Sequence, residues 1–297
     1  YRSADLLHWE YVHPLLTGTV RDPGEVWECP NFFPLGDRHV LLVSVTPGMG
    51  TYYFIGGYAD QVFTPEHQGW LDHGMGGFFA PQTLLDNLGR RLIIGWLPED
   101  REQSAAVEAG WAGCLSIPRV LTRQREGALS CVPVPELSAL RGEPRRFTDV
   151  ALQPGTRTPL DGLQGEALDL VATIDPGDAA QVGLVVRASP GGEEETRLLY
   201  DRASESLILD RARSSLSEGV GREERRAPLR LAPGEPLKLR VLLDHSAIEV
   251  FAAEGVPLTS RIYPSRPDSL GVGVLAEGGT ARLRALEGWP MRSIWED

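Results

Sequence analysis

The apolar residues of this chain fall in short runs that turn residues separate, and this pattern excludes most helical folds. In the first half the runs are three to six residues long, and Gly, Asp and Asn cluster between them. They are Val40–Val45, Tyr52–Ile55, Thr83–Leu85 and Leu92–Trp96. Short strands at even spacing are typical of sandwiches, barrels and propellers. The sequence therefore predicts an all-β protein.

A proline-bearing stretch, residues 133–146, divides the chain into two parts. We predict a first β domain over residues 1–140, a linker over 141–150 and a β-sandwich of two antiparallel sheets over 151–297. The polar segments Gly191–Glu195 and Gly219–Arg226 are expected to be exposed hairpins or loops. Alternating strands are predicted at Ala167–Ile174, Val182–Arg187, Leu237–Leu243, Ile248–Phe251 and Gly271–Leu275.

Composition narrows the classes of partner. The 297 residues include 24% charged and 42% hydrophobic residues, the balance of a globular protein. A net charge of -12 argues against nucleic acid or an anionic membrane as partner, whereas a neutral sugar is compatible with it. Three scattered cysteines are too few for a disulfide framework or a zinc site, and no apolar run reaches membrane-spanning length.

The tetrapeptide Trp27-Glu28-Cys29-Pro30 places one carboxylate between an indole, a thiol and a proline. Such neighbours suit a catalytic acid, because apolar surroundings raise the pKa of a carboxyl group towards working pH. The alternative is a strand-end glutamate that happens to follow a tryptophan. Strand alternation predicts that Glu28 and Cys29 face opposite ways. Cys29 is interpreted as an apolar neighbour, since no His/Asn motif accompanies it.

Glu28-Cys29-Pro30 resembles the Glu-Cys-Pro motif of glycoside hydrolase family 32, whose members cleave β-fructofuranosides. Further blocks that resemble the family occur in family order over nearly the whole chain, which makes the resemblance specific. They are Phe78–Gln82, Gly89–Trp96, Trp111–Gly113 with Leu115–Arg119, and Asp244–Phe251 with Ser260–Pro264.

The resemblance implies a partial five-bladed β-propeller followed by a C-terminal β-sandwich that packs against it through an apolar face. It implies hydrolysis of terminal β-D-fructofuranosides (sucrose or fructans) with retention, with Glu28 as general acid/base. The implied partner is a small carbohydrate, and no metal or organic cofactor is implied. Two alternatives stay open: a fructosyltransferase on the same scaffold, and a non-catalytic carbohydrate-binding relic.

The second carboxylate of such a site is not evident in the sequence. The family's nucleophile is an aspartate in a Trp-Met-Asn-Asp-Pro-Asn block, which does not occur here. Residues 3–10 resemble the strand shortly before Glu-Cys-Pro, so we expect about two of the five blades, and both family aspartates, to lie upstream of Tyr1. Asp22 resembles the family's Arg-Asp-Pro aspartate, but it precedes Glu28 by only six positions and is interpreted as a turn residue.

Substrate-binding residues are expected from the aromatic and acidic positions of the matched blocks. Trp27, Phe79 and Trp111 are predicted to wall the sugar site, although each could instead pack in a core, as is favoured for Trp96. Asp72 either accepts hydrogen bonds from sugar hydroxyls or forms an Asx-type turn before Gly74.

Several other positions are interpreted from the same blocks. Arg119 either holds a buried carboxylate or pairs at a blade edge. Asn31, Gly77 and Phe79 depart from the family pattern, which puts fine specificity in doubt. In the sandwich, Asp244, Glu249 and Arg261 are interpreted as structural.

Overall fold

The computed structural model describes residues 1–20, 25–124, 127–253 and 255–295. Strands dominate, as the sequence predicted. The helical elements are α1 (Gln103–Ala109) and the 3₁₀ helix η1 (Pro135–Leu140). No helix in the described ranges has the length and apolar character needed to cross a membrane.

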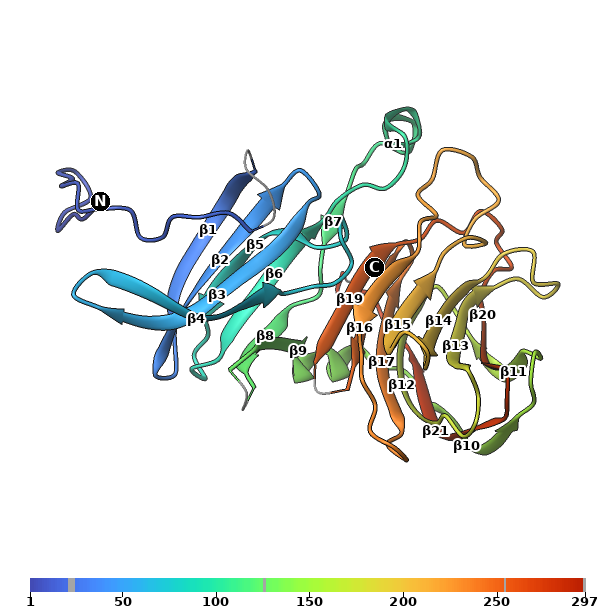
Figure 1. The fold of residues 1–297 in the computed structure, drawn as a ribbon. Helices are drawn as coiled ribbons and strands as arrows, with labels where there is room; N and C mark the ends of the chain where they lie inside the picture. The colour runs from blue at the N-terminus through green and yellow to red at the C-terminus, as the bar shows by residue number, and fades with distance from the viewer. Residues whose placement is uncertain (21–24, 125–126, 254, 296–297) are drawn as a thin grey trace.

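The N-terminal part contains two antiparallel sheets that stand side by side (Figure 1). All four apolar runs predicted for this part lie within their strands. The first sheet has the order β1 (Val26–Leu35), β2 (Arg38–Thr46), β3 (Gly50–Ala59) and β4 (Val62–Trp70). The second has the order β5 (Phe79–Leu85), β6 (Arg91–Leu97), β8 (Arg119–Arg123) and β9 (Leu129–Pro133), with β7 (Cys114–Leu115) paired to β6.

These two sheets have the four-stranded meander of propeller blades, and their edge strands β1 and β5 lie next to each other. Before β1, the described residues 1–20 form an isolated bridge between Arg2 and Glu10. Leu15, Leu16 and Val20 of this segment pack on the apolar face of the first sheet that carries Val43.

The C-terminal part is a sandwich of two six-stranded antiparallel sheets (Figure 1, right). Its core is made of inward-facing aliphatic side chains from both sheets. One sheet has the order β10 (Arg145–Leu152), β21 (Ala281–Pro290), β12 (Ala167–Asp175), β17 (Leu237–Asp244), β18 (Ala247–Ala252) and β19 (Val256–Arg261). The other has the order β11 (Thr158–Gln164), β20 (Gly271–Glu277), β13 (Gln181–Ala188), β14 (Thr196–Asp201), β15 (Ser206–Asp210) and β16 (Arg225–Pro228).

Two local expectations for this part were wrong. Arg145 starts β10, so residues 145–150 of the stretch 141–150 that we expected to be a linker belong to a strand hydrogen-bonded to β21. The segment 191–195 is not uniformly exposed, because Glu194 is fully buried. Its carboxylate accepts hydrogen bonds from the backbone of Leu216 and Arg266 and from the Ser269 hydroxyl, which compensate for its burial.

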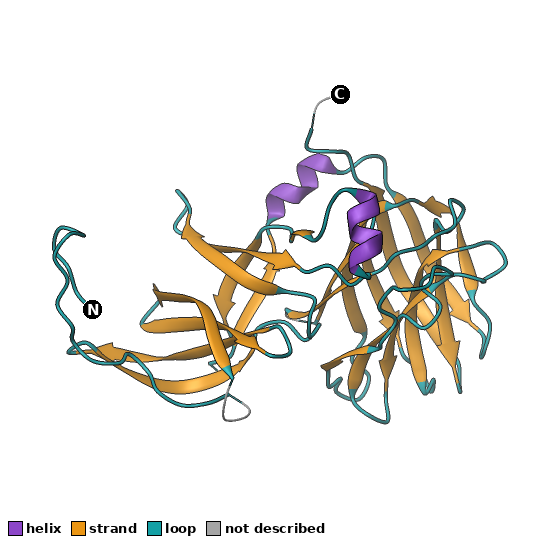
Figure 2. Cartoon of the chain, turned by 90° about the horizontal axis from the view of Figure 1, so that it is seen from above, coloured by secondary structure: helices purple, strands orange, loops and turns teal. Residues whose placement is uncertain are grey.

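The sandwich packs directly against the second N-terminal sheet, as predicted, through an apolar contact. Leu242, Ala247 and Phe251 of the sandwich belong to the same buried cluster as Phe78 and Leu97 of the N-terminal part. Figure 2 shows both helical elements near this junction. The two parts therefore share a core rather than being joined by a flexible tether.

Candidate functional site

Glu28 lies near the start of β1, the edge strand of the first sheet that faces β5. It is half-buried and sits opposite Ser44 of β2. The Thr46 hydroxyl donates a hydrogen bond to its Oε1 atom at 3.2 Å. The buried Ser44 hydroxyl in turn accepts a hydrogen bond from the Ala80 amide of β5 at 3.0 Å. Glu28 thus occupies the seam between the two edge strands.

Both edge strands are bulged at this seam. The register of β1 shifts between Glu28 and Asn31, and that of β5 shifts between Phe79 and Gln82. Each bulge contains a non-glycine residue in the left-handed region. These residues are Cys29, with a φ of 47°, and Ala80, with a φ of 46°. Bulges and such strained residues are concentrated near functional sites. The bulge also breaks the simple alternation on which we based opposite directions for Glu28 and Cys29.

Asn31 joins the two bulged strands. Its Nδ2 atom donates hydrogen bonds of 3.0 Å to the carbonyl oxygens of Cys29 and Pro81, and its Oδ1 atom accepts one from the Thr83 amide at 3.1 Å. An aspartate here could accept from Thr83 but could not donate to either carbonyl. The departure from the family pattern at Asn31 therefore has a structural reason in this chain.

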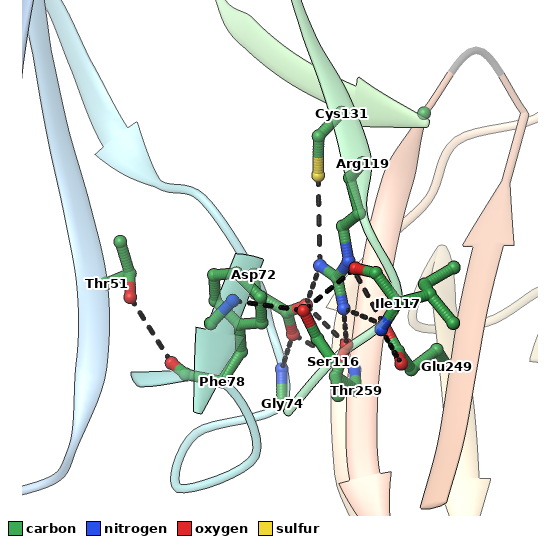
Figure 3. Close-up of polar contacts among 12 residues, drawn as sticks. Thr51, Asp72, Gly74, Phe78, Ser116, Ile117, Arg119, Cys131, Glu249 and Thr259 are labelled. Carbon is green, nitrogen blue, oxygen red and sulfur yellow. Dashed lines mark hydrogen bonds and ion pairs between the residues drawn. The ribbon is translucent and has the colours of Figure 1, made fainter. Parts of the chain in front are cut away.

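Asp72 lies at the buried junction with the sandwich (Figure 3). Its Oδ1 atom accepts hydrogen bonds from the backbone amides of Gly74 (2.9 Å) and Thr259 (3.0 Å). Its Oδ2 atom accepts one from Arg119 Nη1 at 2.8 Å. With 2% exposure and both oxygens engaged, Asp72 is the turn-forming residue of the two alternatives, and its carboxylate has no free face for a sugar.

Arg119 holds two buried carboxylates at once, one from each part of the chain. Besides Asp72, it pairs with Glu249 of β18, with Nη2 at 2.6 Å and Nε at 3.1 Å from Oε2. Its Nη2 atom also donates to the Thr259 hydroxyl at 2.7 Å. The guanidinium stacks between the rings of Phe78 and Phe251. This arrangement, which we call the Arg119 hub, joins the two parts and is not connected to Glu28.

The predicted aromatic residues do not gather around Glu28. Trp27 packs on Phe54 at 5.4 Å, in the apolar cluster that contains Val45. Since Val45 pairs with Trp27 and Ser44 with Glu28, alternation puts Trp27 on the opposite face of the sheet from Glu28. The prediction that Trp27 lines the site with Glu28 is therefore wrong on geometry.

The burial of Phe79 and Trp96 is the reverse of what we expected. Phe79 is buried, with 4% exposure, and meets the Trp96 ring edge-on at 6.5 Å. Trp96 covers it and is itself exposed, as is Trp111, which lies under the Arg101 guanidinium at 4.5 Å. Asp22 falls outside the described residues.

Two family models match the chain and together cover nearly all of it. The N-terminal domain model of glycosyl hydrolases family 32 matches residues 1–133, and the C-terminal model of the same family matches residues 136–290. The chain belongs to glycosyl hydrolase family 32.

Individual relatives agree with this assignment. The chain is 33% identical to a sucrose-6-phosphate hydrolase from Staphylococcus xylosus over 96% of its own length and 58% of the relative. It is 29% identical to a levanase from Bacillus subtilis over 99% of its length and 47% of the relative. Fructan 1-exohydrolase IIa from Cichorium intybus has a similar structure, with a TM-score of 0.81 at 25% identity over 90% of this chain and 62% of that one. The chain thus spans about half the length of these curated family 32 relatives.

The likeness to this and other family 32 structures identifies the architecture as a β-propeller followed by a β-sandwich. In that frame, the two N-terminal sheets are blades, and β1 and β5 are neighbouring edge strands.

A second polar link joins blade and sandwich on the side of α1. Arg211, which is fully buried, donates to Asp100 Oδ2 at 2.6 Å and to the Arg261 carbonyl at 2.8 Å. Glu99 accepts hydrogen bonds from Arg101 and from the Tyr263 hydroxyl. Burial alone would raise the pKa of Glu99, but these donors lower it to about 2. Glu99 is therefore a structural anion of the junction.

Sequence reasoning missed the polar residues that support Glu28. Ser44 and Thr46 lie on the neighbouring strand, and Asn31 was noted only as a departure from the family pattern. Residues that lie opposite Glu28 on the paired strand could have been named as its neighbours, but only if the register of the two strands had been known from the sequence. Glu249 and Arg261 were correctly interpreted as structural, since both are buried at the junction.

Proposed function

We propose that the complete protein is a retaining β-fructofuranosidase that acts on terminal fructosyl groups of sucrose or fructans. Glu28 protonates the leaving oxygen and then activates the water that releases fructose. The observation that carries this proposal is the position of Glu28: half-buried, held by Thr46 and placed at the bulged seam of two blades in a family 32 chain. The levanase, the sucrose-6-phosphate hydrolase and the fructan exohydrolase support the substrate class.

The second carboxylate of the pair is proposed to come from outside residues 1–297. A retaining glycosidase places its nucleophile about 5–5.5 Å from the acid/base. Asp72 does not serve, because the Arg119 hub engages both of its oxygens. The coverage of only about half of each curated relative agrees with this proposal.

A non-catalytic carbohydrate-binding protein is the second candidate. It is favoured by the same sequestration of Asp72, which removes that carboxylate as a partner of Glu28 in the part of the chain that the structure describes. Residues 1–297 alone are expected to hydrolyse sucrose and fructans negligibly in both cases. The two candidates differ in whether the complete protein turns over.

The test compares Glu28→Gln with wild type in the complete protein. We expect kcat to fall about 10²–10⁴-fold on sucrose. On an aryl fructoside kcat/KM should fall much less than on sucrose, because the phenolate leaves without protonation, whereas kcat should still fall because Glu28 also activates the water. Glu66→Gln, an exposed glutamate of β4, is the matched control and should leave kcat unchanged. Equal turnover by wild type and Glu28→Gln on sucrose would exclude Glu28 as the acid. Product analysis at high sucrose separates hydrolysis from fructosyl transfer.

A further inference from the structure

The two carboxylate oxygens of Glu28 have different surroundings. Oε1 lies 3.2 Å from the hydroxyl oxygen of Thr46, whereas Oε2 accepts no hydrogen bond from the residues that the structure describes. Both side chains are half-buried at the seam between the blades. The carboxyl group therefore has one oxygen that the protein holds and one that is available to a substrate.

Strand pairing explains why Thr46 is the partner. Val26 pairs with Thr46 and Glu28 pairs with Ser44, so these four side chains lie on one face of the sheet. Ser44 is directly opposite Glu28, but its hydroxyl accepts the Ala80 amide and so anchors β5. The Glu28 carboxylate instead reaches its diagonal neighbour Thr46, over a distance that long side chains span.

The Thr46 hydroxyl has one hydrogen and two acceptors within reach. The Val26 carbonyl oxygen lies 3.5 Å away, farther than the 3.2 Å to Glu28 Oε1. An ionised carboxylate can only accept, and a hydrogen bond to a charged acceptor is the stronger one, so the hydrogen is donated to Glu28. The branched Cβ atom of threonine restricts its χ1 angle, which holds the hydroxyl at this place.

This contact distinguishes the two oxygens when Glu28 is protonated. A neutral carboxyl group carries its hydrogen on one oxygen only. A hydrogen on Oε1 would meet the hydrogen of the Thr46 hydroxyl, which would then have to turn to the longer contact with Val26. A hydrogen on Oε2 leaves the bond from Thr46 intact. The acid form with its proton on Oε2 is therefore favoured.

We infer that Thr46 is a positioning residue that places the acid proton of Glu28 on Oε2. The inference rests on the proposed function and deepens it. Thr46 exchanges no proton itself, and it acts by keeping the reacting carboxyl group in one orientation and one protonation pattern, as the orienting aspartate of a catalytic triad does for its histidine.

The same contact serves both steps of a retaining reaction. In the first, Oε2 gives its proton to the leaving oxygen as the bond from that oxygen to the fructosyl carbon breaks and the nucleophile bonds to the carbon. In the second, a water oxygen bonds to the carbon, the bond to the nucleophile breaks, and the proton of the water passes to Oε2. Thr46 donates to Oε1 throughout, so Glu28 does not have to rotate between the steps.

The experiment replaces Thr46 by Val in the complete protein, which exchanges the hydroxyl for a methyl group of similar size. The measured quantity is kcat/KM on sucrose divided by kcat/KM on an aryl fructoside, whose phenolate leaves without protonation. We expect this ratio to fall about tenfold, the loss that accompanies one hydrogen bond to a charged group. Thr46→Ser keeps the hydroxyl and should restore most of the ratio. Thr64→Val, at an exposed threonine of β4 in the same sheet, is the control and should leave the ratio unchanged.

A double-mutant cycle separates positioning of Glu28 from direct contact of Thr46 with the sugar. If Thr46 acts through Glu28, adding Thr46→Val to Glu28→Gln should cause no further loss on sucrose. If the hydroxyl instead binds the substrate, the two losses should add, and the inference would be overturned.

Two other results would also refute the role of Thr46. They are a ratio that Thr46→Val leaves unchanged, and a ratio for Thr46→Ser as low as that for Thr46→Val. Should Thr46→Val not fold, Thr46→Ala compared with Thr46→Ser gives the decision through the same ratio. Any of these results, together with a large loss in Glu28→Gln, would leave the proposed function standing. Full sucrose turnover by Glu28→Gln would remove the proposed function and this inference together.

Discussion

The Arg119 hub gives the sharpest stability prediction. Arg119→Met keeps most of the side-chain volume and the contacts with Phe78 and Phe251 but removes the charge. It leaves the carboxylates of Asp72 and Glu249 buried, with 2% and 3% exposure, and without their cation. Removing one partner from a buried ion pair costs about 3–5 kcal/mol. Such a loss is a large share of the roughly 5–15 kcal/mol that stabilises a folded domain.

The assay is urea unfolding followed by tryptophan fluorescence at pH 7. The matched control is Arg123→Met on the same strand, whose exposed pair with Asp37 contributes little. A triple variant with Asp72→Asn, Arg119→Met and Glu249→Gln carries no buried charge at the Arg119 hub, so it should recover much of the loss.

The loss of unfolding free energy in Arg119→Met should also be smaller at acidic pH. Burial raises the folded-state pKa of Glu249 and Arg119 opposes this rise, so without the guanidinium the pKa lies still further above its unfolded value. A group of this kind destabilises the fold as the pH rises through its folded pKa, so the loss is largest at neutral pH and smaller near pH 4–5. A midpoint for Arg119→Met equal to that of Arg123→Met, or a triple variant no more stable than the single one, would refute the reasoning.

Three further perturbations test other parts of the structure. The donors around Glu194 outweigh its burial and lower its pKa from 4.5 to about 2, so its contribution to stability is present above about pH 4.5 and is lost as the pH falls towards 2. Glu194→Gln should lower the unfolding free energy by about 1–3 kcal/mol and weaken the dependence of stability on pH between about 4.5 and 2. Glu193→Gln, which changes an exposed glutamate, is the control and should have neither effect. Asn31→Asp in the complete protein should lower kcat more than it changes KM, because it disturbs the seam that positions Glu28; an unchanged kcat would count against this role. Gly77→Ala places a Cβ atom 2.0 Å from the Thr259 carbonyl oxygen and should lower the melting temperature, while Gly57→Ala, whose Cβ meets nothing nearer than 3.9 Å, should be mild.

Strand positions were predictable because each strand is specified locally. Val40–Val45 and Leu237–Leu243 are apolar stretches bounded by turn residues, and both lie within strands. The apolar contact between the two parts was predicted as well. The start of β10 was missed, because Arg145 and its neighbours lack an apolar pattern and are held by pairing with the distant strand β21.

The site was less predictable because its contacts are long-range. Arg119 lies 47 residues from Asp72 and 130 from Glu249, and no local pattern reveals such partners. Trp27 was a different kind of error. The alternation that we applied to Cys29 also separates Trp27 from Glu28, and applying it to both neighbours would have removed Trp27 from the candidate site.

The Arg119 hub also determines how this protein could be recombined with its relatives. The family models divide the chain between residues 133 and 136, which suggests a convenient crossover point for chimaeras. A crossover there would take Asp72 and Arg119 from one parent and Glu249 and Thr259 from the other. A chimaera should therefore take each domain together with the residues of the other domain that contact it at the Arg119 hub. A chimaera should tolerate new loops far better than a mismatched junction.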